Sequence, residues 1–189
     1  MKHLIGLGNP GREYEQTRHN VGFMVLERLG ERHHAAWKMD RVFTARRAVV
    51  GSVQLLQPQT MMNHSGVSLI PLAKQASPQD LLIVCDDVNI PLGTLRVRAS
   101  GGPGGHHGLE SCLAHLGTED VPRLRVGVGR ASMPNDLTGF VLSAFDREER
   151  PQLEEALSRA VEACEVWIED GIHAAMNRTN HTLKQEGTT

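Results

Sequence analysis

The sequence predicts an α/β fold in a single domain, residues 1–189, with a twisted, mixed and mostly parallel β-sheet flanked by helices. Short apolar runs with the length of buried strands alternate along the chain with longer segments of helical periodicity. The length of 189 residues fits one domain, and 40% hydrophobic with 22% charged residues is enough to build a core. The chain is therefore expected to fold as one soluble globule.

Six apolar runs are the strand candidates. Two of them, residues 43–50 and 53–57, lie so close together that they predict an antiparallel hairpin at one side of the sheet. The longer crossovers elsewhere suit parallel pairing. The other strand candidates are residues 3–8, 81–85, 94–99 and 124–129, and the helix candidates are residues 21–34, 65–75, 108–116 and 147–170.

The amino-acid composition argues against several classes of protein function. Aromatic residues are only 4%, which leaves little material for stacking on unpaired bases, and a net charge of −2 gives no global basic field. Cys85, Cys112 and Cys164 form no CxxC pair, which argues against a disulfide framework or a cysteine zinc site. Reduced thiols and the lack of any apolar stretch long enough for a membrane span predict a cytoplasmic protein without a membrane anchor. Residues 185–189 are polar and expected to fray.

The segment Gly6 to Gly11, GLGNPG, formally matches the GxGxxG pattern of dinucleotide-binding proteins. Its context argues against that function, because a polar turn follows it and the acid about twenty residues on, Glu27, lies inside a predicted helix. No cofactor is therefore expected. Asn9, at the carboxyl end of the first strand, can instead orient a substrate carbonyl, although asparagine is also a common turn former.

A histidine and a carboxylate follow two different predicted strands. His19 lies in a polar loop just before a helix, and a neutral imidazole there is a candidate general base. The apolar run 81–85 ends in Asp86, so we expect this carboxylate at the carboxyl tip of the strand, where it could orient an imidazole. The alternatives are a histidine without a task and acidic residues that only cap the turn before Pro91.

The segment 100–108 is dense in glycine and contains His106 and His107. It lacks the Lys and Ser/Thr of an ATP-binding Walker loop. Adjacent histidines on a helix point about 100° apart, so a shared metal ion is disfavoured and no metal site is predicted. Alternating arginines on the flanking strands would form a phosphate-binding patch, or else ordinary solvated strand faces. These arginines are Arg96, Arg98, Arg123, Arg125 and Arg130.

Six motifs occur in a fixed order, and together they closely resemble the bacterial-type peptidyl-tRNA hydrolase family. They are GLGNPG, Tyr14 with TRHNVG, TMMNHSG, VCDDVNIPLG, GGPGGHHGL and RLRVGVGR. Residues 136–146 resemble the lid element of that family. The resemblance implies a monomeric, metal-free α/β enzyme whose partner is peptidyl-tRNA and which hydrolyses the ester between peptide and tRNA.

The resemblance also implies a role for each matching residue. His19 would be the base that activates water, and Asp86 would be its carboxylate partner. Asn9, the third catalytic residue, and Asn63 would hold the backbone of the peptide and the scissile carbonyl. Tyr14 and Met62 would line the pocket, His106 and His107 would contact substrate, and Arg96, Arg98, Arg125 and Arg130 would meet tRNA phosphates.

One departure from the family pattern falls at a functional position, whereas His64 stands where the family usually has leucine and Pro103 at a commonly variable position. The glycine-rich motif of the family normally reads GGHNG, and His107 stands where the family has a functional asparagine. A neutral imidazole still offers one donor and one acceptor, but it can become charged. The alternative to an active hydrolase is a catalytically weak relative that binds RNA through the same surface. The presence of Asn9, His19, Asp86 and Asn63 favours the hydrolase.

Overall fold

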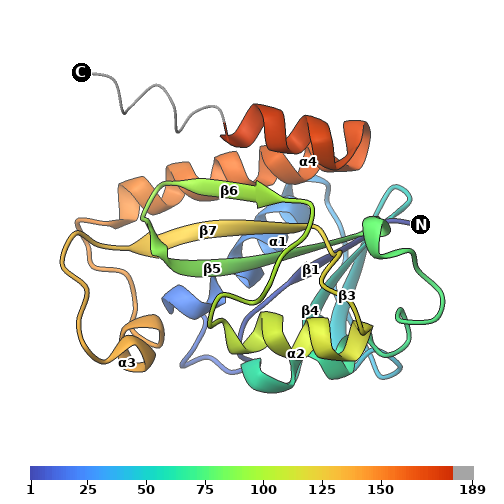
Figure 1. The fold of residues 1–189 in the computed structure, drawn as a ribbon, viewed down its shortest axis with the longest axis horizontal. Helices are drawn as coiled ribbons and strands as arrows, with labels where there is room; N and C mark the ends of the chain where they lie inside the picture. Colours follow the sequence, from blue (N-terminus) through green and yellow to red (C-terminus); the bar gives the residue numbers. More distant parts are fainter. Residues whose placement is uncertain (181–189) are drawn as a thin grey trace.

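The computed structural model describes residues 1–180 and confirms the predicted fold class (Figure 1). In this part of the chain, seven strands form one sheet in the order β2-β3-β4-β1-β5-β7-β6. The strands are β1 (His3–Gly6), β2 (Lys38–Asp40), β3 (Ala45–Val50), β4 (Val53–Pro58), β5 (Leu81–Pro91), β6 (Leu95–Arg98) and β7 (Arg123–Gly129). The helices are α1 (Val21–Arg32), α2 (His107–Leu116), α3 (Leu137–Val141) and α4 (Arg150–Asn180), with 3-10 segments η1 (Arg18–Asn20), η2 (Met62–Leu69) and η3 (Pro78–Asp80).

The four central strands, β4, β1, β5 and β7, run parallel to one another. The edges are antiparallel, because β2 and β3 continue outward from β4 as a meander and β6 pairs with β7. The predicted hairpin is confirmed by the β3–β4 pairing. The sequence did not reveal β2, because its three residues, Lys-Met-Asp, are largely exposed and show no apolar pattern.

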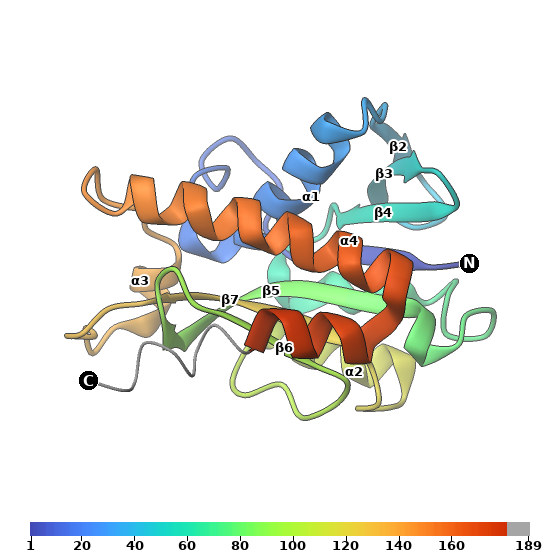
Figure 2. The same cartoon turned by 90° about the horizontal axis from the view of Figure 1, so that it is seen from above.

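Helices cover both faces of the sheet, as Figure 2 shows from above. The period-two alternation of β1 sends Leu4 into the core under α1 and α4, and Ile5 into the core under α2 and η2. β5 divides its side chains in the same way, with Val84 in the first core and Cys85 in the second. Both faces of these central strands are therefore buried, which explains their continuous apolar runs.

Two predicted helices differ from the structure. The C-terminal helix, predicted for residues 147–170, begins at Arg150 and continues to Asn180 across a break at Gly171, whose φ of 83° favours glycine. The second half of α4 reaches the edge strand, where the side chain of Asn180 accepts from the N–H of Val97 (2.9 Å) and donates to its carbonyl (3.0 Å). A long-range contact of this kind leaves no local signal in the sequence.

The second difference is the predicted helix over residues 65–75. The structure has the 3-10 segment η2, which begins earlier and ends at Leu69, followed by turns. The predicted frayed tail, residues 185–189, lies outside the described residues. Within residues 1–180, no helix combines the length and the apolar character that crossing a membrane requires.

Candidate active site

A cavity of about 550 Å³ opens where the central parallel strands end. Its floor is β5 around Asp86, and its walls are η2, the glycine-rich loop before α2, and α3. We call it the substrate cavity. It is lined by Asn9, His19, Met61, Met62, Asn63, Asp86, Asp87, Val88, Asn89, Gly104, Gly105, His106, His107, Arg125, Leu137, Thr138, Val141 and Leu142.

The glycines of the first motif serve close packing of α1 on the sheet. A Cβ atom on Gly22 of α1 would lie only 2.5 Å from the nitrogen and 2.6 Å from the oxygen of Leu7, so no larger residue fits. Gly6 faces the backbone of Gly22 in the same way. This contact fixes the start of α1, and with it η1, against the carboxyl ends of β1 and β5. Close packing on α1 thus explains Gly6 and Gly8 of the GxGxxG match, whereas Gly11 has a φ of 116° in the loop that follows.

Asn9 is held in place by hydrogen bonds to both of its backbone groups. The side chain of Asn20 accepts from the N–H of Asn9 and donates to its carbonyl, both at 2.9 Å. The side-chain oxygen of Asn9 accepts from the N–H of Met62 at 2.7 Å. These bonds leave the amide NH₂ of Asn9 as the group that can donate into the cavity that this residue lines.

Two imidazoles converge on one oxygen of Asp86. This side chain is buried, and its Oδ1 accepts from Nδ1 of His19 at 2.8 Å and from Nε2 of His106 at 2.9 Å. Burial by itself would raise the pKa of Asp86. The charge and hydrogen bonds of His106, followed by those of His19, outweigh burial and hold the pKa of this carboxyl well below its usual range. Asp86 is therefore a carboxylate at neutral pH.

The second nitrogen of each ring defines its tautomer. His106 precedes α2 as its N-cap, and its Nδ1 accepts from the N–H of Leu109 at 3.1 Å. Its proton must then be on Nε2, which donates to Asp86. His19 donates from Nδ1 to the same carboxylate, so its Nε2 keeps a lone pair at the wall of the cavity. A nitrogen in this state can accept a proton from water.

The same three side chains place one potential metal ligand atom each within 4.8 Å of one another. A metal ion on Nε2 of His106 would have to replace the proton there, and the neutral ring would then carry its proton on Nδ1. That nitrogen already faces the N–H of Leu109, so two donors would oppose each other. The hydrogen bonding of His106 thus favours a carboxylate-imidazole arrangement over a metal site.

The strand that carries Asp86 is longer than predicted. β5 continues to Pro91, so Asp86 does not lie at its tip; the carboxylate instead lies just past the end of the neighbouring β1, whose last paired residue is Gly6 opposite Val84. A register shift against β7 follows Asp87. The expected neighbourhood of Asp86 and Asn9 therefore arises from the short partner strand, which the sequence of β5 alone does not reveal.

Most of the predicted site residues line the cavity, and four do not. Tyr14 is half-buried in a turn, where its carbonyl accepts from the hydroxyl of Thr17 at 2.8 Å. Arg130 follows β7 and pairs with Asp146 at 2.7 Å. The predicted residues that line the cavity are Asn9, His19, Met62, Asn63, Asp86, His106, His107 and Arg125, and those that do not are Tyr14, Arg96, Arg98 and Arg130.

The alternating arginines lie in register across β6 and β7 but differ in exposure. Arg96 pairs with Arg125, and Arg98 with Arg123. Arg98 is exposed, whereas Arg123 is buried and donates to backbone carbonyls. The predicted phosphate patch is therefore divided into an exposed outer strand and a buried inner strand.

Arg125 lines the cavity and holds the glycine-rich loop that forms one of its walls. Its guanidinium is only 11% exposed and lies 3.1 Å from a carboxylate oxygen of Asp87. It also donates to the carbonyls of Gly102 and Pro103, at 3.2 and 3.0 Å. These bonds brace the glycine-rich loop, so the burial and partners of Arg125 argue against the phosphate contact predicted for it. Alternation along a strand cannot show which of two neighbouring strands is covered.

The glycine-rich loop leaves its two histidines in different environments. His106 is buried against Asp86, whereas the side chain of His107 is 76% exposed at the mouth of the cavity. Its nearest polar partner is Glu110, at 3.4 Å. Of the two histidines expected to contact substrate, His106 therefore lies in the interior of the cavity and His107 at its rim.

Sequence reasoning missed the residues that support the site. Asn20, which orients Asn9, is adjacent to His19 in the TRHN motif, and that adjacency is a usable signal. Residues 136–146 were expected to form a lid, but the side chains that line the cavity were not identified; Leu137 and Val141 of α3 have the i, i+4 spacing of one helix face. Asp136 begins this short helix by accepting from the N–H of Gly139 at 2.9 Å.

Comparison with known proteins finds one family along nearly the whole chain. The family model described as peptidyl-tRNA hydrolase matches residues 3–187. The peptidyl-tRNA hydrolase of Syntrophomonas wolfei is 42% identical, covering 95% of this chain and 100% of the relative. That of Gemmatimonas aurantiaca is 44% identical, covering 94% of this chain and 98% of the relative. The crystal structure of the Acinetobacter baumannii peptidyl-tRNA hydrolase superposes with a TM-score of 0.88 at 33% identity, over 95% of this chain and 94% of that one.

Proposed function

The chain belongs to the peptidyl-tRNA hydrolase family, and we propose that it hydrolyses the ester bond of peptidyl-tRNA with His19 as the general base. The products are free peptide and free tRNA. The observation that carries this proposal is the 2.8 Å hydrogen bond between Nδ1 of His19 and the Asp86 carboxylate, at the wall of the cavity that His19 lines. In the neutral ring this bond leaves the lone pair on Nε2. An imidazole oriented in this way is prepared to remove a proton from water.

The reaction needs two proton transfers through His19. Nε2 takes a proton as water attacks the ester carbonyl, and the tetrahedral intermediate carries the resulting negative charge. The buried carboxylate of Asp86 stabilises the imidazolium that forms. The imidazolium then returns the proton to the departing tRNA oxygen as the carbon–oxygen bond breaks. The hydroxyl group of the water ends on the peptide and its proton on the tRNA oxygen, and His19 returns to its starting protonation state.

Amide groups supply the electrostatic part of catalysis. The NH₂ group of Asn9 is oriented by two neighbouring chain segments and can donate to the developing oxyanion. Asn63 is exposed at the same cavity and is assigned to the backbone of the peptide. The apolar walls from Met62, Val141 and Leu142 suit peptide side chains. Residues 136–146, which contain α3, are proposed as the lid.

The deciding experiment compares two substrates with the purified, EDTA-treated protein. We expect hydrolysis of N-acetyl-aminoacyl-tRNA, which mimics a peptide ester, and none of free aminoacyl-tRNA. His19→Ala protein is the control for a contaminating esterase. Tight binding of either tRNA without hydrolysis would instead support the catalytically weak RNA-binding relative, and hydrolysis of both substrates would contradict the assignment of a peptide-selective site.

We also infer that the protein acts as a monomer in the cytoplasm. All three cysteines are free and buried, and burial raises the pKa of each thiol, which suits a reducing compartment. Sedimentation at the concentrations used for kinetics tests the monomer, since a stable dimer there would contradict it.

A further inference from the structure

The three consecutive residues of η1 reach three different parts of the site. The side chain of Asn20 bonds the backbone of Asn9, and the ring of His19 donates to Asp86. The side chain of Arg18 points to neither of these, and runs to the segment that follows α3. The single turn η1 therefore contacts the proposed oxyanion donor Asn9, carries the proposed base His19, and contacts the cavity wall formed by α3.

Arg18 is a fully buried cation between two aromatic rings. Its guanidinium carbon lies 4.5 Å from the ring centre of Phe140 in α3 and 4.7 Å from that of Phe145 just beyond it. Its Nη2 donates to Glu149 at 2.7 Å. Within residues 1–180, its Nε and Nη1 are buried without a hydrogen-bond partner.

The backbone reinforces the same junction. The N–H of Arg18 donates to the carbonyl of Ser143 at 3.1 Å, and Thr17 forms an isolated antiparallel bridge with Ala144. α3 itself has only five residues, too few to be stable alone. Its position over the cavity therefore depends on contacts with η1.

A second arginine lies close to the same ring. The guanidinium of Arg130 lies 5.1 Å from the centre of Phe140 and pairs with Asp146. Glu149 lies between the two cations, and also accepts from the N–H of Asp146 at 2.7 Å. Burial opposes ionisation of Glu149, but the bonds from Arg18 and Asp146 outweigh it and lower its pKa, so the carboxylate stays charged.

Burying a charged guanidinium with two N–H groups that lack hydrogen-bond partners within residues 1–180 costs folding free energy. Apolar side chains of similar volume often stabilise a fold as well as a buried ion pair or better. A cation stacked on rings, in contrast, sets both the distance and the angle between η1 and α3. Arg18 is therefore suited to positioning more than to stability.

We propose that Arg18 is a positioning residue that couples the placement of α3 over the substrate cavity to the orientation of His19. When α3 lies against the Arg18 guanidinium, the cavity has its apolar wall and η1 is clamped between β5 and residues 143–145. Loss of the clamp frees the wall and lets the imidazole leave its alignment. This role rests on the proposed function, because the consequence it predicts is a loss of ester hydrolysis.

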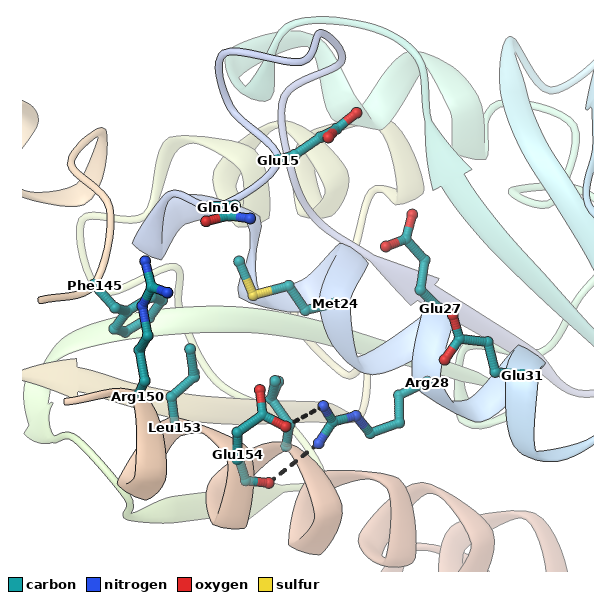
Figure 3. A pocket seen from close by; sticks show the side chains of 11 residues that line it. Glu15, Gln16, Met24, Glu27, Arg28, Glu31, Phe145, Arg150, Leu153 and Glu154 are labelled. Atoms are coloured by element: carbon teal, nitrogen blue, oxygen red, sulfur yellow. Dashed lines mark hydrogen bonds and ion pairs between the residues drawn. The ribbon is translucent and has the colours of Figure 1, made fainter. Parts of the chain in front are cut away.

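The test replaces Arg18 by methionine, which keeps an unbranched apolar side chain between the rings and removes the charge. Arg28→Met is the matched control, because Arg28 also forms an ion pair between two elements, with Glu154 of α4 (Figure 3). Neither residue of that pair lines the substrate cavity. Three readouts are needed: kcat and KM on N-acetyl-aminoacyl-tRNA, hydrogen exchange of the amides in residues 137–145, and the melting temperature.

For Arg18→Met we expect a folded protein with a modestly lower melting temperature, because the Glu149 carboxylate loses Arg18 but keeps its contact with Arg130. We also expect exchange in residues 137–145 faster by about tenfold, and kcat lower by about tenfold or more. Arg28→Met should change kcat, KM and exchange by less than about twofold. Unchanged kcat with a folded Arg18→Met protein would overturn the proposal, whether or not exchange increases. Unchanged exchange would overturn it as well.

A second variant covers the case in which Arg18→Met does not fold. Phe140→Leu keeps Arg18 and removes the ring from the side of α3, and it should give the same changes in exchange and kcat to a smaller extent, about threefold each. Wild-type values of exchange and kcat in Phe140→Leu would then overturn the proposal. The exchange readout needs no substrate, so a failure of the proposed hydrolysis would show in the wild-type protein and is distinguishable from a failure of the coupling.

Discussion

Two hollows of similar size on this molecule differ in the placement of their charges. The substrate cavity measures about 550 Å³, and the groove between α1 and α4 about 440 Å³. In the cavity, the Asp86 carboxylate is buried and two imidazoles address one of its oxygens. In the groove, charged side chains stand around an open rim (Figure 3). The groove is lined by Glu15, Gln16, Met24, Glu27, Arg28, Glu31, Phe145, Arg150, Leu153, Glu154 and Leu157.

Charged side chains of the groove form ion pairs in contact with solvent, one within the groove and one with Arg46 outside it. The guanidinium of Arg28 contacts the carboxylate of Glu154 and lies 3.2 Å from its carbonyl oxygen. Glu27 is 3.2 Å from Arg46, with both side chains more than a third exposed. Exposed pairs of this kind are screened and contribute little. The two hollows have similar volumes, so the feature that distinguishes the candidate active site is its buried and oriented charge.

The largest effect is expected at the base. His19→Ala should lower the single-turnover rate of ester hydrolysis about 100- to 10,000-fold, the usual contribution of a general base. The fold should survive, because the ring lies at the cavity wall and only partly buried. Stopped-flow or quench measurement of the rate, with circular dichroism for the fold, checks this. A rate within about tenfold of the wild type would remove His19 from the role of base.

Replacing the shared carboxylate should have the next largest effect. Asp86→Asn removes the charge that stabilises the imidazolium, while an amide oxygen at the Oδ1 position can still accept from both rings. The rate should fall roughly 100-fold. The kinetic comparison with His19→Ala is informative, because the double variant should lose no more than His19→Ala alone. An additive loss would mean that Asp86 acts independently of His19.

Asp86 also contributes to acid stability. Its pKa is depressed by folding, so its contribution to the free energy of unfolding is complete above the ordinary value of 3.8 and is lost as the pH falls through the lower folded value. Urea unfolding between about pH 4 and pH 2 should therefore show a steeper loss of stability in the wild type than in Asp86→Asn. Parallel curves would contradict the depressed pKa.

The two arginines of the divided patch should behave differently. Arg98→Gln, on the exposed strand, should flatten the slope of log affinity for tRNA against log salt by about 0.7 to 0.9 for each phosphate that Arg98 neutralises. Arg125→Gln should leave that slope unchanged and raise KM instead, because its partners are Asp87 and the glycine-rich loop. Equal changes of slope in both variants would show that Arg125 reaches phosphate after all.

A small effect is expected at the departure from the family pattern. His107→Asn should change kcat/KM by less than about threefold near neutral pH, because the ring is exposed at the rim and Glu110 is its one hydrogen-bond partner among the described residues. Rates at several pH values for both proteins provide the measurement. Loss of activity in His107→Asn would show that the site depends on the imidazole.

The smallest effect is expected in the groove. Glu31→Gln removes an exposed carboxylate from its rim and should change neither kcat/KM nor the melting temperature beyond experimental error. Glu149→Gln is the informative contrast, since that carboxylate is mostly buried against Arg18 and its loss should be measurable in the melting temperature. A strongly altered kcat/KM in Glu31→Gln would indicate that the groove also takes part in function, and would contradict the distinction between the two hollows.

Much of the fold could be predicted from local pattern. The continuous apolar runs of β1 and β5 and the amphipathic stripe of α1 are set by burial on two faces or one, so they appear in the sequence. β2 and the extension of α4 past Gly171 could not be predicted, because their stability comes from neighbours distant in the chain. The 3-10 geometry of η2 is likewise decided by its packing on α2.

The sequence by itself determined which groups are available: a histidine in the TRHN turn, acids after an apolar strand, and amides in GNPG and MMNHSG. Only the tertiary structure decided their relations. The partners His19 and Asp86 are 67 residues apart, and Arg18 and Glu149 are 131 apart. Periodicity and propensity act over a few residues, whereas a hydrogen bond across the fold requires two elements packed to within fractions of an ångström. That packing placed His106 on the Asp86 carboxylate, buried Arg125 in the cavity wall and set Arg18 between two rings.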